Sequence, residues 1–112
     1  MHSEAAKRFE RGTDPLLPAV AAQRAVDLLV QYGGGHADPA VFDLNNLPEP
    51  TSYEFALSDA ERLTGVSYAP ERVRQLLEEV GCTIKDIDDE RVLVTPPSWR
   101  PDLTGAAHFV EE

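Results

Sequence analysis

A group of acidic side chains and one histidine lies near the C-terminal end of the sequence. Its members are Asp102, His108, Glu111 and Glu112. If the residues from Ala106 onward form a helix, the last three stand at positions i, i+3 and i+4 and project from one face. Carboxylate oxygens suit Mg²⁺, whereas a histidine is more typical of a transition-metal site. The alternative is a solvated acidic helix end, and the residues alone favour it because carboxylates are common on exposed faces.

Other kinds of active-site chemistry have little support. The one cysteine, Cys82, cannot form an internal disulfide or a multi-thiolate zinc site, and we expect it to be a small buried apolar residue. No serine lies in a nucleophile elbow. The glycines at 33–35 follow a predicted helix, whereas an anion site needs glycines before a helix. We therefore predict no catalytic residue and no nucleotide-binding residue.

The charge of the chain disfavours indiscriminate binding to nucleic acid. Twenty acidic residues against ten basic ones give a formal net charge of −10, which repels a phosphate backbone at long range. Lys7, Arg8 and Arg11 form a local basic patch, which we interpret as a solvated helix face.

Trp99 and Arg100 invite a binding-site interpretation as well. We favour the structural alternative, in which Trp99 packs on a helix pair while Arg100 forms a salt bridge or caps a carbonyl.

Length and composition predict one modest soluble domain. The chain has 112 residues, of which 42% are hydrophobic and 27% charged. No apolar stretch approaches the roughly 20 residues that cross a bilayer, and the N-terminus has no apolar signal core. We therefore expect a cytoplasmic chain with no membrane partner.

The N-terminal part predicts a helical arm and a linker. Apolar residues at helical spacing predict a helix that opens near Pro18 and stops at the glycines of 33–35. Residues 36–50 have the composition of a loop, although Val41 and Phe42 could form a short edge strand. We divide the chain into a helical segment and linker at 1–51 and a main domain at 52–112.

The main domain begins with a short strand and two helices. Alternating residues from Tyr53 to Leu57 predict the strand, and a capping box of Ser58 and Glu61 predicts a helix that ends near Gly65. A second helix begins at Pro70 and is closed by a glycine. Its predicted core face consists of Val73, Leu76, Leu77 and Val80.

A β-hairpin and a last helix complete the predicted domain. Apolar residues around an acidic turn at 88–90 predict the hairpin, and the prolines at 96–97 end it. The fold class is thus α+β: a small winged-helix-like domain with two short helices on an antiparallel hairpin, preceded by the helical arm. The last helix, from Ala106, is expected to be cut short.

Several motifs resemble one enzyme family. VTPPSWRPDLTGAAHFVEE, residues 94–112, closely resembles a motif in the beta subunit of bacterial phenylalanine–tRNA ligase (phenylalanyl-tRNA synthetase), where a Pro-Ser-Trp-Arg-x-Asp corner leads into a helix with paired glutamates. KRFERGTDP, residues 7–15, resembles the segment after the editing domain of that subunit. LSDAERLTGV and PERVRQLLEEVGC resemble the two helices of its B-five domain. The resemblance covers essentially the whole chain.

The resemblance implies a piece of a multidomain beta chain, with 1–51 following the editing domain and 52–112 forming the B-five domain. In the family, two alpha and two beta chains form a tetramer. The alpha chain activates phenylalanine with ATP and Mg²⁺ and charges the tRNA, and the beta chain contributes editing, anticodon recognition and scaffolding. This piece would be a non-catalytic structural and interaction domain, inactive alone, whose partners are the alpha chain, neighbouring beta-chain domains and, in the whole enzyme, tRNA.

The resemblance also implies a magnesium position shared with the alpha chain. Its ligands fall on Asp102, Glu111 and Glu112, and the remaining acidic position of the family is His108 here. The histidine removes one carboxylate, and without the alpha chain we expect the isolated chain to hold no Mg²⁺.

Two other functions remain open at this point. A helix pair followed by a hairpin is compatible with a winged-helix nucleic-acid-binding module, although the second helix carries Glu71, Glu78 and Glu79 beside Arg72 and Arg74. The other is an independent acidic protein-interaction domain with an accidental motif match.

Overall fold

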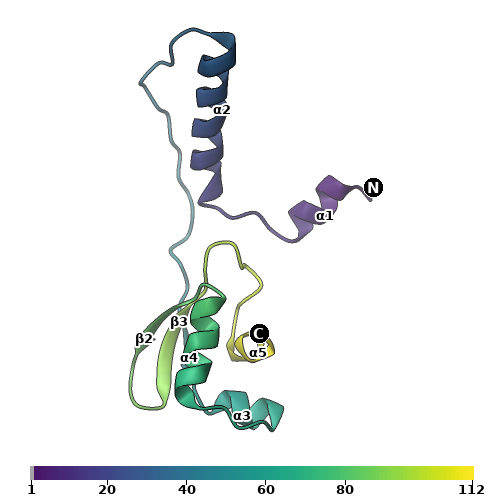
Figure 1. Ribbon diagram of the computed structural model, residues 1–112, viewed down its shortest axis with the longest axis vertical. Coiled ribbons are helices and arrows are strands. Elements are labelled where there is room, and N and C mark those ends of the chain that lie inside the picture. Colours follow the sequence, from purple (N-terminus) through teal and green to yellow (C-terminus); the bar gives the residue numbers. More distant parts are fainter. Residues whose placement is uncertain (1) are drawn as a thin grey trace. The chain divides into compact units, whose positions relative to one another are not determined.

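The computed structural model describes residues 2–112 (Figure 1). Contacts within the chain divide it into two compact units, Met1–Glu49 and Pro50–Glu112, and each is described by itself. Of the helices in the described part, none has both the length and the apolar character needed to cross a membrane.

The first unit contains two helices, α1 (Glu4–Glu10) and α2 (Leu17–Gly33). The Ser3 side chain caps α1 by accepting a hydrogen bond from the backbone N–H of Ala6. A proline in the first turn opens α2, and Gly34 ends it at φ 73°. The predicted helix is confirmed, but neither helix contains a buried residue.

The loop predicted for residues 36–50 is confirmed, and the short edge strand that Val41 and Phe42 could have formed is not present there. Both side chains are almost fully exposed, at 85% and 92%. The carboxylate of Asp38 accepts from the N–H of Ala40, and such local turns compete with the ladder hydrogen bonds that a strand needs.

The second unit is built on a three-stranded antiparallel sheet with the order β1-β3-β2. The strands are β1 (Tyr53–Ala56), β2 (Thr83–Asp86) and β3 (Arg91–Thr95). Strand β3 is central and pairs with both neighbours, so that Val94 lies opposite Tyr53 on one side and Ile84 on the other. The mixed α+β class and the hairpin are confirmed, whereas the winged-helix likeness stays a prediction.

Three helices accompany the sheet (Figure 1): α3 (Asp59–Thr64), α4 (Pro70–Glu79) and α5 (Ala106–Glu111). Gly65 ends α3 in the left-handed region, and Pro70 opens α4 as predicted. The predicted capping box is wrong, because the Ser58 side chain makes no capping hydrogen bond. Ser58 has the αR conformation, whereas a capping side chain needs an extended one.

The core of this unit joins the sheet to helices α3, α4 and α5. Phe55, Val92 and Val94 are the largest fully buried side chains. Helix α4 adds the buried side chains of Val73 and Leu77 to the core. Leu76 and Val80 were also expected in the core, but their side chains are only half-buried. The ring of Phe109 from α5 packs edge-on against Phe55 and Tyr53, with centroids 5.9 and 6.0 Å apart. Aromatic packing therefore fixes the face of α5 that meets the sheet.

Candidate functional site

The candidate site is the corner that carries the chain from β3 to α5. The prolines at 96–97 end the strand because they cannot donate to its ladder. The backbone N–H of Arg100 donates to the carbonyl of Pro97 at 3.0 Å, and that of Leu103 donates to the carbonyl of Arg100 at 3.3 Å. These two turns place the Leu103 side chain in the core, where it is 3% exposed. The corner is therefore an ordered part of the domain.

Arg100 is the centre of this corner. Its Nε and Nη2 atoms donate to the two carboxylate oxygens of Asp102 at 2.9 and 2.8 Å, a bidentate pair. The same Nη2 atom also donates to Oε1 of Glu112, the residue that follows α5. One guanidinium thus connects the corner to the end of the last helix.

The three charges stabilise one another. Hydrogen bonds from Arg100 hold the pKa of Asp102 and the pKa of Glu112 below their usual values. The hydrogen bonds to Asp102 and then Glu112 raise the pKa of Arg100 above its usual value. All three side chains are therefore ionised at neutral pH, with two negative charges around one positive charge.

The four predicted metal ligands have different surroundings in the structure. Asp102 and Glu112 both face Arg100. The Nδ1 atom of His108 lies 3.3 Å from the hydroxyl of Thr104, and Glu111 is exposed on the last turn of α5. Between residues 2 and 112, no three His, Cys, Asp or Glu side chains are grouped so that they could hold a metal ion.

The residues as they lie do not fit Mg²⁺. That ion requires near-octahedral oxygen ligands at about 2.0–2.1 Å. Both oxygens of Asp102 are engaged by a guanidinium, and Glu112 shares the same partner. The predicted ligand set therefore stays a prediction, and it would require the carboxylates to leave Arg100.

Trp99 lies on the outside of the corner. Its side chain is 58% exposed, so the expectation that it packs on the helix pair is wrong. It lies instead beside Gly81, just after α4. The expected salt bridge of Arg100 is confirmed.

Cys82 is buried at 6% exposure, as predicted, and burial raises the pKa of its thiol. A raised pKa disfavours the thiolate that nucleophilic catalysis needs.

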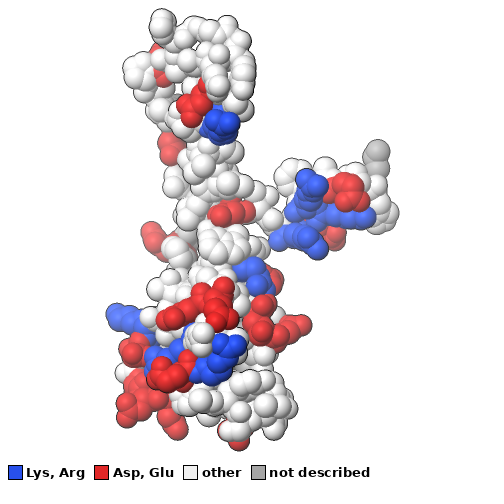
Figure 2. All heavy atoms as spheres, viewed as in Figure 1, with Lys and Arg blue, Asp and Glu red and all other residues white. Residues whose placement is uncertain are grey.

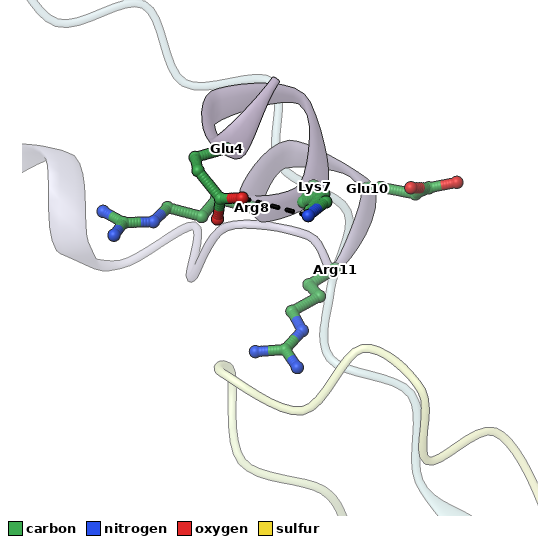
Figure 3. Close-up of a pocket in the computed structure, with 5 residues that line it drawn as sticks. All are labelled: Glu4, Lys7, Arg8, Glu10 and Arg11. Carbon is green, nitrogen blue, oxygen red and sulfur yellow. Dashed lines mark hydrogen bonds and ion pairs between the residues drawn. The ribbon is translucent and has the colours of Figure 1, made fainter. Parts of the chain in front are cut away.

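The basic patch of α1 is exposed on the first unit (Figure 3). Lys7 forms an ion pair with Glu4 at 3.0 Å, and Arg8 and Arg11 extend from the helix in different directions in Figure 3. The hollow that these three cations line also has the carboxylates of Glu4 and Glu10 in its wall, so its charge is mixed. Mixed charge disfavours the binding of an anion and supports the solvated-face interpretation.

The arginines of the second unit are ion-paired, and red and blue side chains lie side by side over it in Figure 2. The pairs are Arg62 with Asp59, Arg72 with Glu79, Arg74 with Asp86, Arg91 with Glu54 and Asp88, and Arg100 with Asp102 and Glu112. On α4 this leaves the two arginines facing carboxylates, a poor surface for phosphate.

A small hollow lies among α3, α4 and α5. Its volume is about 90 Å³, and its lining includes Phe55, Leu76 and Phe109. Sites for small molecules and cofactors typically measure roughly 300–1,000 Å³. The hollow is therefore a packing gap at the edge of the core.

The sequence analysis did not predict two features of this site. Leu103 and Phe109 are core residues, and only their apolar side chains within polar surroundings could have indicated it. The partnership of Arg100 with Glu112 joins residues twelve positions apart, for which the sequence has no periodic pattern.

Comparison with known proteins identifies the second unit. The family model described as the tRNA synthetase B5 domain matches residues 53–112. The chain belongs to the tRNA synthetase B5 domain family. The B5 domain thus coincides with the strands, the three accompanying helices and the corner around Arg100.

Relatives match the whole chain, including the part before the B5 domain. The phenylalanine–tRNA ligase beta subunit of Streptomyces avermitilis is 47% identical over 110 residues, covering 98% of this chain and 13% of that protein. Those of Corynebacterium efficiens and Bifidobacterium longum are 44% and 38% identical, covering 100% and 98% of this chain and 13% of each protein. The resemblance seen in the motifs is confirmed. The chain spans about 13% of the length of these curated relatives.

Proposed function

We propose that this chain is a non-catalytic structural and interaction domain of the beta chain of a phenylalanine–tRNA ligase. The whole enzyme would charge tRNA with phenylalanine using ATP, and this chain would contribute shape and contact surface. The supporting observation is that a B5 domain and the segment before it match one continuous stretch of beta subunits at up to 47% identity.

The chemistry of the second unit supports a non-catalytic role. Its hollow of about 90 Å³ is too small for ATP, its cysteine is buried, and its arginines face carboxylates of the same unit. Adenylate formation needs a site that binds nucleotide and stabilises phosphate charge.

The first unit supports an interaction role. Helix α2 buries none of its residues, and it exposes Leu17, Val20 and Leu29 at 51%, 66% and 69%. Figure 2 shows few charges over this helix. A helix that exposes apolar side chains on more than one side is typical of an element that other protein covers. The partners would be neighbouring domains of the beta chain and the alpha chain, with tRNA bound by the whole enzyme in the cytoplasm.

Magnesium would belong to the assembled ligase. Asp102, His108, Glu111 and Glu112 would be its ligands from this chain, shared with the alpha chain. The isolated chain has only the ion-paired arrangement around Arg100.

A pyrophosphate-exchange assay tests the non-catalytic role. The isolated chain, incubated with ATP, Mg²⁺, phenylalanine and labelled pyrophosphate, is expected to form no labelled ATP. The intact Streptomyces avermitilis ligase under the same conditions is the positive control. Phenylalanine-dependent exchange by this chain without an alpha chain would overturn the proposal.

A further inference from the structure

We propose that Arg100 is the resident cation of the Asp102–Glu112 carboxylate pair, so that this chain binds a divalent cation there only when Arg100 is displaced. The inference rests on the geometry of the corner and does not depend on the proposed function.

Arg100 of the same chain donates hydrogen bonds to both carboxylate oxygens of Asp102. The guanidinium is planar, and its two N–H groups meet the two oxygens of Asp102 at 2.9 and 2.8 Å. Because Asp102 is only two residues away, the arginine is present at a high effective concentration. A dissolved cation must compete with this tethered partner at both oxygens.

Electrostatics opposes simultaneous occupancy. A divalent cation placed between Asp102 and Glu112 would stand beside the positive charge of Arg100. The other two predicted ligands do not compensate, because His108 lies against Thr104 and Glu111 is exposed. Entry of the cation and departure of the arginine are therefore coupled.

The contact also holds α5 in place. Arg100 and Glu112 are 27% and 29% exposed, whereas the exposed pair of Arg91 and Glu54 is at 51% and 54%. Less exposed pairs are screened less by water and salt. Displacement of Arg100 would therefore release the end of α5 as well as two carboxylates.

Arg91 supplies a matched control elsewhere in the domain. It also joins two carboxylates, Asp88 and Glu54, so Arg91→Met removes the same charge and the same number of ion pairs as Arg100→Met. No metal ligand is proposed around Arg91.

The test is calorimetric titration of the chain with MgCl₂ and with MnCl₂, against NaCl at equal ionic strength, together with thermal unfolding in each salt. The unmodified chain is expected to show no saturable heat and no divalent-specific rise in Tm. Arg100→Met is expected to gain both, because the positive charge beside the two carboxylates is removed. Arg91→Met is expected to gain neither.

Two results would overturn the proposal. One is saturable binding of either metal by the unmodified chain that Arg100→Met leaves unchanged or weakens. The other is a folded Arg100→Met chain that gains no binding. If Arg100→Met does not fold, Arg100→Lys takes its place, because lysine keeps the charge but cannot form the bidentate pair. The Arg100→Lys chain is expected to bind the metals more tightly than the unmodified chain. Equal affinity of these two chains would overturn the proposal.

Discussion

The indole ring of Trp99 lies so close to Gly81 that a Cβ atom on the glycine would stand 2.8 Å from Trp99 Cζ2. Gly81 also has φ 102°, a conformation that side chains rarely adopt. The backbone conformation and the place of the Trp99 ring therefore both disfavour a side chain at position 81, where the chain leaves α4 and enters β2.

Gly81→Ala is expected to destabilise the domain more than Gly65→Ala. Gly65 has φ 75° but open space around it, so its substitution costs backbone strain alone, about 1–2 kcal/mol. At Gly81 the methyl group must also displace Trp99. Urea unfolding measures the two losses, and Trp99 emission should change only in Gly81→Ala. Equal losses with unchanged emission in both variants would contradict this account.

Leu77→Ala is expected to lower the free energy of unfolding by about 3 kcal/mol, because it removes a side chain that is 2% exposed and leaves a cavity. Leu63→Ala is the control, since Leu63 is 50% exposed on α3, and its loss should stay within about 1 kcal/mol. Similar losses for the two variants would show that Leu77 is not a core residue.

The elements predicted well from sequence are those set by local patterns. The helix periodicity around Val73 and Leu77 and the proline at 70 identify α4, and both α4 residues are buried as expected. The same holds for α2, which needs only its apolar spacing and the glycine stop. These features lie within one or two turns of chain, where geometry and sequence pattern correspond directly.

The features that sequence could not provide join distant residues or depend on backbone conformation. Tyr53 is paired with Val94 across the sheet, and no local pattern specifies that partner. Ser58 has the residue type of a cap but the wrong backbone conformation for one, because the chain turns directly out of β1. The Arg100 pair depends on how α5 docks, which is decided by the burial of Phe109. The metal ligands expected from the sequence therefore stay a prediction, and the ion pairs of Asp102 and Glu112 with Arg100 could not be predicted from local pattern.

The Asp88 side chain is expected to make stability depend on pH. Hydrogen bonds from the backbone N–H of Glu90 and from Arg91 hold the pKa of Asp88 below its usual value. Its contribution is therefore fully present above the unfolded value of about 3.9 and is lost as pH falls through the lower folded value. Asp88→Asn keeps an acceptor oxygen but loses the charge.

The stability difference between the unmodified chain and Asp88→Asn should be constant near neutral pH and shrink below about pH 4. Urea unfolding across the acid range measures it. A difference that does not change with pH would argue against an ionised Asp88 as a stabilising group of the β2–β3 turn.

Cys82 is expected to react slowly with thiol reagents in the folded chain, because it is 6% exposed and burial raises the pKa of its thiol. The control is Thr83→Cys in a Cys82→Ala background, since Thr83 is the adjacent exposed residue. We expect labelling of Cys82 to be on the order of a hundredfold slower than that of the control cysteine, and equal rates in urea. Comparable rates in the folded chains would mean that the thiol is accessible.

The proposed role in a ligase is tested most directly by a chimera. The matching segment of the Streptomyces avermitilis beta subunit, 47% identical, is replaced by this chain, and charging of tRNA with phenylalanine is measured after co-expression with the alpha chain. We expect the chimera to co-purify with the alpha chain and to charge tRNA, and a chimera carrying Leu77→Ala to lose assembly and charging together. A chimera whose inserted segment is folded but which neither binds the alpha chain nor charges tRNA would contradict the account.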